Sequence, residues 1–434
     1  MSIGIIGILG VAALLAAILA RVPIGLALAT VGFLGYAAAD GWLKALKMLG
    51  SVPFNLSTAY SLSVVPLFIL MGAVASRAAM SRELFDAANA IFSGFRGALT
   101  NATIGACAAF GAICGSSIAT AATFSKVSIP EMRRHGYDPG FAAGAVAAAG
   151  TLGIIIPPSV ILAIYSIVAE QSLAKLFAAS MVPGLILAAL YVITVVIVAR
   201  VRPDLTPRVE SMPLAERLRA ARGMWKLVLL FFLAVVGIYI GWFSPTEAAA
   251  VSAFAAIVIA FATGHMGWRG LVDALVETVY TTAMLFFIVI GAFIFARFIV
   301  LTQFPTALVG WVQEWGLSPV MIILAVMLLY FLLGTFLEGV STILITVPVT
   351  LPLVTSLGYD GVWFGIFVTV MATIGLISPP TGMTVFVIQA QNPDIPVARI
   401  YRGTLPFLAA DFVLVALLIV APGIVAWLPR LLKM

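Results

Sequence analysis

Two proline pairs, each followed by a hydroxyl residue, are the residues whose types and spacing could do chemistry in this chain. Pro157-Pro158-Ser159 and Pro379-Pro380-Thr381 lie 222 residues apart, in surroundings that are otherwise strongly apolar. Two consecutive prolines remove two backbone N–H donors and clash with the preceding helical turn, so each pair predicts a broken helix. The break leaves carbonyl oxygens without helical partners, and such oxygens are ligands for a hard cation such as Na⁺.

Two other apolar segments are interrupted by small and polar residues. Gly115-Ser116-Ser117 divides one of them, and Glu338-Gly339-Val340-Ser341-Thr342 divides the other. Both interruptions are typical of hairpin tips, because non-helical backbone at membrane depth survives only inside protein or beside water. A tip beside a broken helix would offer oxygens to a cation, and helix N-termini at the tips would offer N–H groups to an anion. The alternative is that the prolines only kink packed helices and the hydroxyl groups bond back to their own helix.

The rest of the chain predicts an all-α polytopic membrane protein. Of its 434 residues 63% are apolar and 9% are charged, and several charge-free stretches approach or exceed the roughly 20 residues that span hydrocarbon. Residues 1–20 are expected to be a spanning helix rather than a cleaved signal, and no polar stretch exceeds the loop at 200–226. The chain has no Gly-rich nucleotide loop, His-Glu-x-x-His motif or Cys/His cluster, so we expect neither an ATP-driven pump nor an enzyme. The distribution of its net charge of +6 also argues against a nucleic-acid partner.

The repeated motifs divide the chain into two copies of one unit, residues 1–222 and 223–434. The first copy is predicted to contain a hairpin at about 99–129 and a broken helix at about 140–169. The second is predicted to contain a hairpin at about 319–355 and a broken helix at about 361–392. Each copy crosses the membrane an odd number of times, so the second must be inverted relative to the first.

The basic residues give this arrangement an orientation. Ten crossings, with both termini outside, place 17 of the 23 Lys and Arg residues on the cytoplasmic side, together with the loop at 200–226. Segment 82–96 is amphipathic and predicts a helix in the membrane interface, and its counterpart 302–316 carries Trp311 and Trp315, which suit the opposite interface. Connecting loops are the alternative for both.

Two acidic residues in apolar surroundings have open roles. Glu338 could bind an ion or gate the second tip, or be a solvated acid at its mouth. Asp411 could pair with an arginine of another helix or take part in transport.

At these same residues the chain resembles the large membrane subunit of tripartite ATP-independent periplasmic (TRAP) transporters, the DctM family. Four segments carry the resemblance, which extends over essentially the whole length: Phe110–Thr123, Gly150–Ser159, Leu337–Thr342 and Pro379–Gly382. It implies an elevator fold like that of the ion transporter superfamily, with two inverted repeats, re-entrant hairpins and broken helices. It also implies Na⁺-driven import of a small organic anion, such as a C4-dicarboxylate or a sialic or other sugar acid, across the bacterial inner membrane.

The resemblance further implies partners and site residues. The partners would be membrane lipid, a small four-helix membrane subunit similar to DctQ and a periplasmic substrate-binding protein similar to DctP. A stand-alone Na⁺/dicarboxylate symporter or ion antiporter without a binding protein is the alternative. The substrate-binding residues would be Ser117, Thr120 and Thr342. The resemblance places the ligands of two or more Na⁺ ions at Ser116, Ser117, Pro157, Ser159, Gly339, Thr342, Ser378 and Thr381. The tip residues Gly115 and Glu338 are further candidate ligands from the sequence itself.

Overall fold

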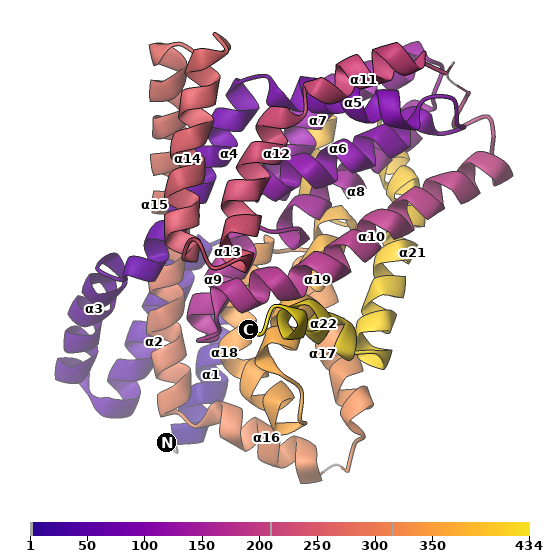
Figure 1. The fold of residues 1–434 in the computed structure, drawn as a ribbon. Helices are drawn as coiled ribbons and strands as arrows, with labels where there is room; N and C mark the ends of the chain where they lie inside the picture. The colour runs from indigo at the N-terminus through magenta and orange to yellow at the C-terminus, as the bar shows by residue number, and fades with distance from the viewer. Residues whose placement is uncertain (1–2, 209–210, 315) are drawn as a thin grey trace.

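The computed structural model describes residues 3–208, 211–314 and 316–434, and these ranges fold as an all-helical protein (Figure 1). The described part holds no β-strand; Arg96 and Arg208 form an isolated bridge between loops. Six of the described helices are long and apolar enough to cross a membrane, or up to eight spans if each of two bent helix pairs counts as one. The prediction of a polytopic all-α membrane protein is therefore confirmed, while the count of ten crossings stays a prediction.

The first half of the chain contains the first hairpin and the first broken helix. Residues 115–116 separate the two hairpin arms α6 and α7, and α8 and α9 are bent by 43° where the proline pair separates them. The helices are α1 Ile3–Leu19, α2 Ile24–Asp40, α3 Trp42–Ser57, α4 Val64–Arg77, α5 Met80–Phe92, α6 Ala98–Cys114, α7 Ser117–Arg134, α8 Pro139–Ile155, α9 Val160–Val168 and α10 Leu173–Val201.

The second half repeats this order after a connecting helix. A five-residue π-helical turn, Phe232–Val236, lies between α12 and α13. The helices are α11 Leu214–Arg222, α12 Trp225–Phe231, α13 Gly237–Tyr239, α14 Pro245–Ala262, α15 Trp268–Leu301, α16 Phe304–Glu314, α17 Pro319–Gly334, α18 Gly339–Ser356, α19 Gly361–Ile377, α20 Met383–Gln391, α21 Val397–Val420 and α22 Gly423–Leu431.

Helix bounds in the two halves match closely at the predicted breaks. Both bounds of α8 recur 222 residues later as the bounds of α19, from 139 to 361 and from 155 to 377. Asp138 and Asp360 cap these helices, each accepting a hydrogen bond from a backbone N–H of the first turn. The same local sequence therefore starts and stops the helix in both halves.

Three helices were not anticipated from the sequence. Segment 42–57 forms α3, and α11 and α22 lie in the central loop and near the C-terminal end. In the second half, the single 34-residue helix α15 spans the positions that correspond to α3, the turn after it and α4. The halves thus share one order of elements but differ in where that long helix is interrupted.

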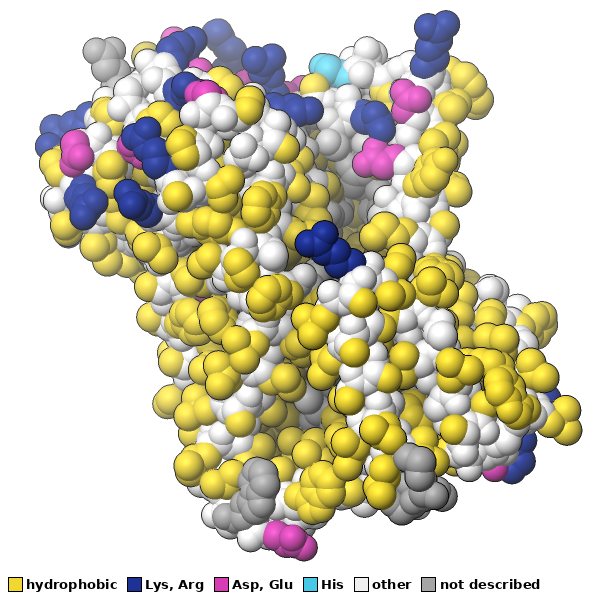
Figure 2. Space-filling view, turned by 180° about the vertical axis from the view of Figure 1, so that it is seen from behind, with side chains coloured by type: hydrophobic (Ala, Val, Ile, Leu, Met, Phe, Trp, Pro, Cys, Tyr) yellow, Lys and Arg dark blue, Asp and Glu magenta, His cyan; other side chains and the backbone are white. Residues whose placement is uncertain are grey.

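The expected interfacial helices are present and lie at opposite ends of the molecule. Figure 1 shows α5 at the upper end and α16 at the lower end. Trp315, named with α16 in the sequence analysis, lies outside the described residues. Lys and Arg side chains gather toward the upper end in Figure 2, and hydrophobic side chains cover most of the middle.

The outer helices and the helices that carry the breaks form two packing groups, which meet where α4 contacts α6 and α9 and where α15 contacts α18. α2 packs along α15, and α4 packs on both α14 and α15. The hairpin arms α6 and α7 pack on α8, which in turn packs on α21, and α17 and α18 pack on α19. Both predicted tips are therefore held against the broken helices of their own half.

Candidate functional site

The first hairpin tip turns at Gly115, whose backbone has the left-handed conformation that favours glycine. Gly115 has φ +63°, and a Cβ atom there would lie 3.0 Å from the carbonyl oxygen of Pro158. Ser116 caps α7, and its hydroxyl oxygen accepts a hydrogen bond from the N–H of Ala119 at 3.3 Å. The tip residues thus lie directly against the first proline pair, as the sequence predicts.

The first helix break is closed in part by its own hydroxyl residue. The Pro157–Pro158 bond is cis, and the fully buried Ser159 caps α9 by accepting from the N–H of Leu162. Its Oγ also donates to the carbonyl oxygen of Ile154 at 2.6 Å. One carbonyl that the proline pair would otherwise leave free is therefore already satisfied.

Close contacts between glycines hold the hairpin arm on the broken helix. A Cβ atom at Gly111 would lie 2.4 Å from the Cα of Gly153, and one at Gly150 would lie 2.7 Å from the Cβ of Ala121. Gly153 also lies beside the tip, since a Cβ atom there would be 3.1 Å from the Thr120 hydroxyl oxygen and 3.3 Å from the Ser116 carbonyl. These positions admit no side chain. These contacts were not predicted from the sequence.

The second hairpin repeats the glycine contact at its own break. A Cβ atom at Gly375 would lie 2.4 Å from the carbonyl oxygen of Gly334, at the end of α17. The Pro379–Pro380 bond is also cis, and the hydroxyl of Thr381 donates to the carbonyl oxygen of Thr335 in the tip. The break and the tip of the second half are therefore joined by a direct hydrogen bond.

Other hydroxyl groups near the second break bond within their own segment. Ser378 donates to the carbonyl oxygen of Ile374 at 2.7 Å, and Thr384 donates to that of Leu376 at 2.8 Å. Thr342 donates to the carbonyl oxygen of Glu338 at 3.2 Å. Glu338 itself is partly buried at the start of α18.

The two halves meet at their candidate sites. A Cβ atom at Gly339 would lie 2.9 Å from the side chain of Ile161 on α9 and 3.1 Å from that of Ala372 on α19. The phenol of Tyr165, also on α9, donates to the carbonyl oxygen of Gly361 at 2.5 Å. The second tip therefore contacts both the broken helix of its own half and that of the first half.

Among the named hydroxyl residues, Ser117 differs from the two threonines. Thr120 donates its proton to the Ser116 carbonyl oxygen at 2.8 Å, much as Thr342 does to Glu338. Ser117 is 5% exposed, and no hydrogen bond to its hydroxyl occurs within the described ranges. Nor does any hydrogen bond in these ranges join Ser117 to residues 157–159, or Thr342 to residues 378–381.

The oxygens of both sites are carbonyl and hydroxyl groups, with Glu338 as the one carboxylate among the named residues. No group of three or more His, Cys, Asp or Glu residues that could hold a metal ion occurs in the described part of the chain. Hard oxygen donors without thiolate or imidazole suit Na⁺ better than a transition metal. A hydroxyl that donates its proton to a carbonyl still has lone pairs for a cation, so the geometry fits the predicted ligand class.

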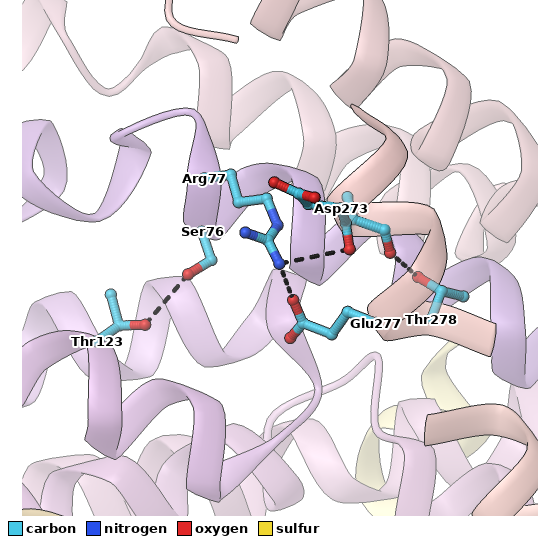
Figure 3. Close-up of polar contacts among 7 residues, drawn as sticks. Ser76, Arg77, Thr123, Asp273, Glu277 and Thr278 are labelled. Atoms are coloured by element: carbon cyan, nitrogen blue, oxygen red, sulfur yellow. Dashed lines mark hydrogen bonds and ion pairs between the residues drawn. The ribbon is translucent and has the colours of Figure 1, made fainter. Parts of the chain in front are cut away.

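Figure 3 shows polar contacts where α4 lies between the first hairpin and α15. The hydroxyls of Ser76 on α4 and Thr123 on α7 are 3.2 Å apart. The guanidinium of the next residue, Arg77, lies 2.5 Å from the carboxylate of Glu277 on α15 and 3.5 Å from the carbonyl oxygen of Asp273. The end of α4 thus contacts a hairpin arm and the longest helix of the other half at once.

A crevice of about 600 Å³ separates the second hairpin from α2 and α15. Its charged lining residues are Arg297 and Glu170, and Val347 and Pro348 of α18 form part of the opposite wall. The crevice therefore places a cationic side chain between the outer helices and a hairpin arm.

Comparison with known proteins gives one family and several relatives. The model of the family described as "Tripartite ATP-independent periplasmic transporter, DctM component" matches residues 11–424. The C4-dicarboxylate TRAP transporter large permease protein DctM of Pseudomonas aeruginosa is 39% identical over 383 residues, which are 88% of this chain and 89% of that protein. The sialic acid TRAP transporter large permease protein SiaM of Vibrio cholerae is 31% identical, over 89% of each chain.

A longer relative and two solved structures extend the comparison. The isethionate TRAP transporter permease protein DctMQ of Oleidesulfovibrio alaskensis is 30% identical over 93% of this chain, which covers 63% of that protein. The YdaH transporter of Alcanivorax borkumensis has a similar fold, with a TM-score of 0.64 at 15% identity over 88% of this chain and 90% of that one. MtrF of Neisseria gonorrhoeae gives a TM-score of 0.56, also at 15% identity, over 88% and 85%.

Proposed function

The chain belongs to the DctM family of tripartite ATP-independent periplasmic transporters and is a large permease subunit, not an enzyme; from this premise we propose that it imports a small organic anion by coupling to Na⁺. The observation that carries the proposal is the pair of hairpin tips, each packed on a proline break and lined with carbonyl and hydroxyl oxygens. Two such sites would bind two Na⁺ ions that are transported together with one anion.

The first proposed Na⁺ site is formed by the tip and the break of the first half. Its ligands would be Gly115, Ser116 and Ser117 with Pro157 and Ser159. The approach of Gly115 to the Pro158 carbonyl supports this grouping, because tip and break lie in van der Waals contact. The hydroxyl of the buried Ser117 makes no hydrogen bond within the described ranges, so a bound cation would give it a polar partner.

The second proposed site is formed in the same way by Glu338, Gly339 and Thr342 with Ser378 and Thr381. The hydrogen bond from Thr381 to the tip carbonyl of Thr335 supports this grouping. Thr342 would bind through its lone pairs, since its proton is directed to Glu338.

The proposed substrate site lies between the two tips, and its named residues are Ser117, Thr120 and Thr342. An anion needs hydrogen-bond donors, and both threonine protons point to carbonyl oxygens. Ser117 and the N–H groups at the start of α7 and α18 are therefore the proposed donors. A C4-dicarboxylate, a sialic acid and isethionate are named for the relatives, and all three are organic anions. We propose the same class here.

Transport is proposed to follow an elevator mechanism in an inverted repeat of residues 1–222 and 223–434. The recurrence of the α8 bounds in α19 supports the repeat. The packing of α2 and α4 on α15, and of α4 on α14, supports a scaffold distinct from the hairpins and broken helices.

The proposed partners are a small DctQ-like membrane subunit and a DctP-like periplasmic binding protein, at the bacterial inner membrane. The relative DctMQ supports the first partner, because its name combines the letters of DctM and DctQ and this chain covers only 63% of its length. The described part of the chain is nearly all helical, and six of its helices are long and apolar enough to span a membrane. This composition supports the need for a separate protein that captures dilute substrate.

Proteoliposomes test this function. They would hold this subunit with its small partner, be energised by a Na⁺ gradient and membrane potential, and be supplied with labelled succinate, N-acetylneuraminate or isethionate and the binding protein. Accumulation is expected only when both Na⁺ and binding protein are present. The Na⁺ ions supply the driving force, since each positive charge that moves inward contributes about 2.3 kcal/mol per 100 mV of membrane potential. The binding protein supplies the substrate. Accumulation without Na⁺ would remove the role of both sites. Full accumulation without binding protein would favour a stand-alone carrier.

A further inference from the structure

Asp411 is an acidic side chain in the interior of the molecule, outside both candidate cation sites. It lies in the middle of α21 with none of its surface exposed. The phenol oxygen of Tyr191 on α10 lies 2.8 Å from its Oδ1. Its Oδ2 is buried without a hydrogen-bond partner among the described residues. The arginine partner considered in the sequence analysis is thus replaced by a neutral phenol.

The helices packed around Asp411 hold no nearby charge. α8, α19 and α20 contain no ionisable side chain. On α21, Arg399, Tyr401 and Arg402 lie nine or more positions away, at least about 13 Å along the helix axis. On α10, Lys175 and Arg200 are at least as far from Tyr191. α17 contacts α21 through the aromatic pair Phe331 and Phe412. The ionisable side chain on α17 is Tyr330, whose phenol oxygen accepts a hydrogen bond from the hydroxyl of Thr346.

Tyr191 continues as a hydrogen-bond chain to α8. Its phenol oxygen lies 3.4 Å from the Thr151 hydroxyl, and Thr151 donates its own proton to the carbonyl oxygen of Ala148 at 2.7 Å. Thr151 can therefore only accept from Tyr191. If Tyr191 donates to Thr151, its oxygen is left to accept a hydrogen bond from a protonated Asp411.

The two protonation states of Asp411 differ sharply in how they satisfy this chain. As a carboxylic acid, Asp411 donates to Tyr191, Tyr191 donates to Thr151, and Thr151 donates to Ala148, so every proton has an acceptor. As a carboxylate, it would bury a charge with one phenol partner and one bare oxygen. An unpaired charge in such a medium is far costlier than a neutral polar group.

We propose that Asp411 is a proton-binding site, and that in this conformation it is a neutral carboxylic acid that donates a hydrogen bond to Tyr191. This chain of hydrogen bonds reaches α8 at Thr151, two residues before Gly153, which packs on the first hairpin tip. Release of the proton would reverse the Asp411–Tyr191 bond and withdraw the Tyr191 proton from Thr151. The inference stands whether or not Na⁺ drives transport.

Infrared spectroscopy of the complete subunit in lipid vesicles at neutral pH tests the proposal. Wild-type protein is compared with protein carrying aspartate labelled with ¹³C at the side-chain carboxyl. We expect a protonated-carboxyl C=O band that shifts to lower frequency with the label and is absent in Asp411→Asn. In Tyr191→Phe the band should move to higher frequency, because the carboxyl loses its acceptor. Asp204→Asn, which removes an exposed aspartate from the loop after α10, should keep the band unchanged.

Three results would overturn the proposal. The first is a wild-type spectrum without any label-sensitive protonated-carboxyl band, a result that needs no variant to fold. The second is a band that persists in Asp411→Asn. The third is a band that appears only after Na⁺ is withdrawn, which would make Asp411 a cation ligand instead.

Discussion

Gly375 lies so close to Gly334 that a methyl group on Gly375 would be 2.4 Å from the carbonyl oxygen of its neighbour. The first half has the matching contact between Gly111 and Gly153. Each pair joins a hairpin arm to the broken helix of the same half, just before the residues of a candidate cation site. The backbone of the arm and the backbone of the broken helix are therefore in direct contact, without side chains between them.

Replacing either glycine with alanine should therefore destabilise the protein. Gly375→Ala and Gly111→Ala add a carbon where backbone atoms already stand, and overpacking of this kind costs about 1–3 kcal/mol. Thermal unfolding in detergent would show a lower transition temperature. Gly310→Ala on α16 is the control, because nothing lies within 4 Å of a Cβ atom there. Equal transition temperatures for all three variants would contradict the contact.

Loss of a proposed ligand should raise the Na⁺ concentration needed for half-maximal uptake. Ser117→Ala and Thr342→Ala each remove one hydroxyl oxygen, worth about 1–2 kcal/mol, or roughly a 5- to 30-fold change in affinity. Uptake by reconstituted vesicles over a range of Na⁺ concentrations measures the effect. Ser57→Ala is the control, since this exposed hydroxyl bonds only to the carbonyl of Pro53 on its own helix. Wild-type Na⁺ dependence in both test variants would rule out these ligands.

The ion pair between Arg77 and Glu277 should contribute little to stability. Their side chains are 35% and 51% exposed, and partly exposed pairs contribute about 0.2–1 kcal/mol. A double-mutant cycle with Arg77→Ala and Glu277→Ala should give a coupling energy in that range, smaller at high salt. A coupling above about 2 kcal/mol would show that the pair is shielded from water in the assembled transporter.

Inverted topology predicts that Ser211 and Ser356 face opposite sides of the membrane. Both residues are exposed in the structure, and both native cysteines are buried, which gives a low labelling background. Ser211→Cys should react with an impermeant thiol reagent from the cytoplasmic side, and Ser356→Cys from the periplasmic side. Labelling of both variants from one side only would reject the topology.

The tips and the breaks could be predicted from the sequence because glycine and proline act locally. The proline pairs end α8 and α19 wherever else the chain goes, and Gly115 begins the first tip. Helix α3 was missed because Gly50 and Pro53, within its span, are unfavourable in an isolated helix. Its contacts with α2 and α15 stabilise it nonetheless.

Contacts between distant segments were not accessible in this way. Tyr191 and Asp411 are 220 residues apart and meet only because α10 and α21, the last long helix of each half, pack together. The glycine contacts likewise depend on how two helices cross. A single sequence marks such residues as unusual for their surroundings, but it does not identify their partners.

The uninterrupted length of α15 sets a limit on how it can sit in a bilayer. Its 34 residues measure about 51 Å, against about 30 Å of hydrocarbon. Even a tilt of about 40°, the upper end of the usual range, leaves about 9 Å beyond the acyl region. At least one end must therefore reach into a headgroup layer, where Trp268 and Arg269 are suited to lie. The corresponding stretch of the first half is interrupted at Thr58 and Ala59, between α3 and α4, so the two halves meet the same membrane differently: the second with one continuous helix and the first with two shorter ones.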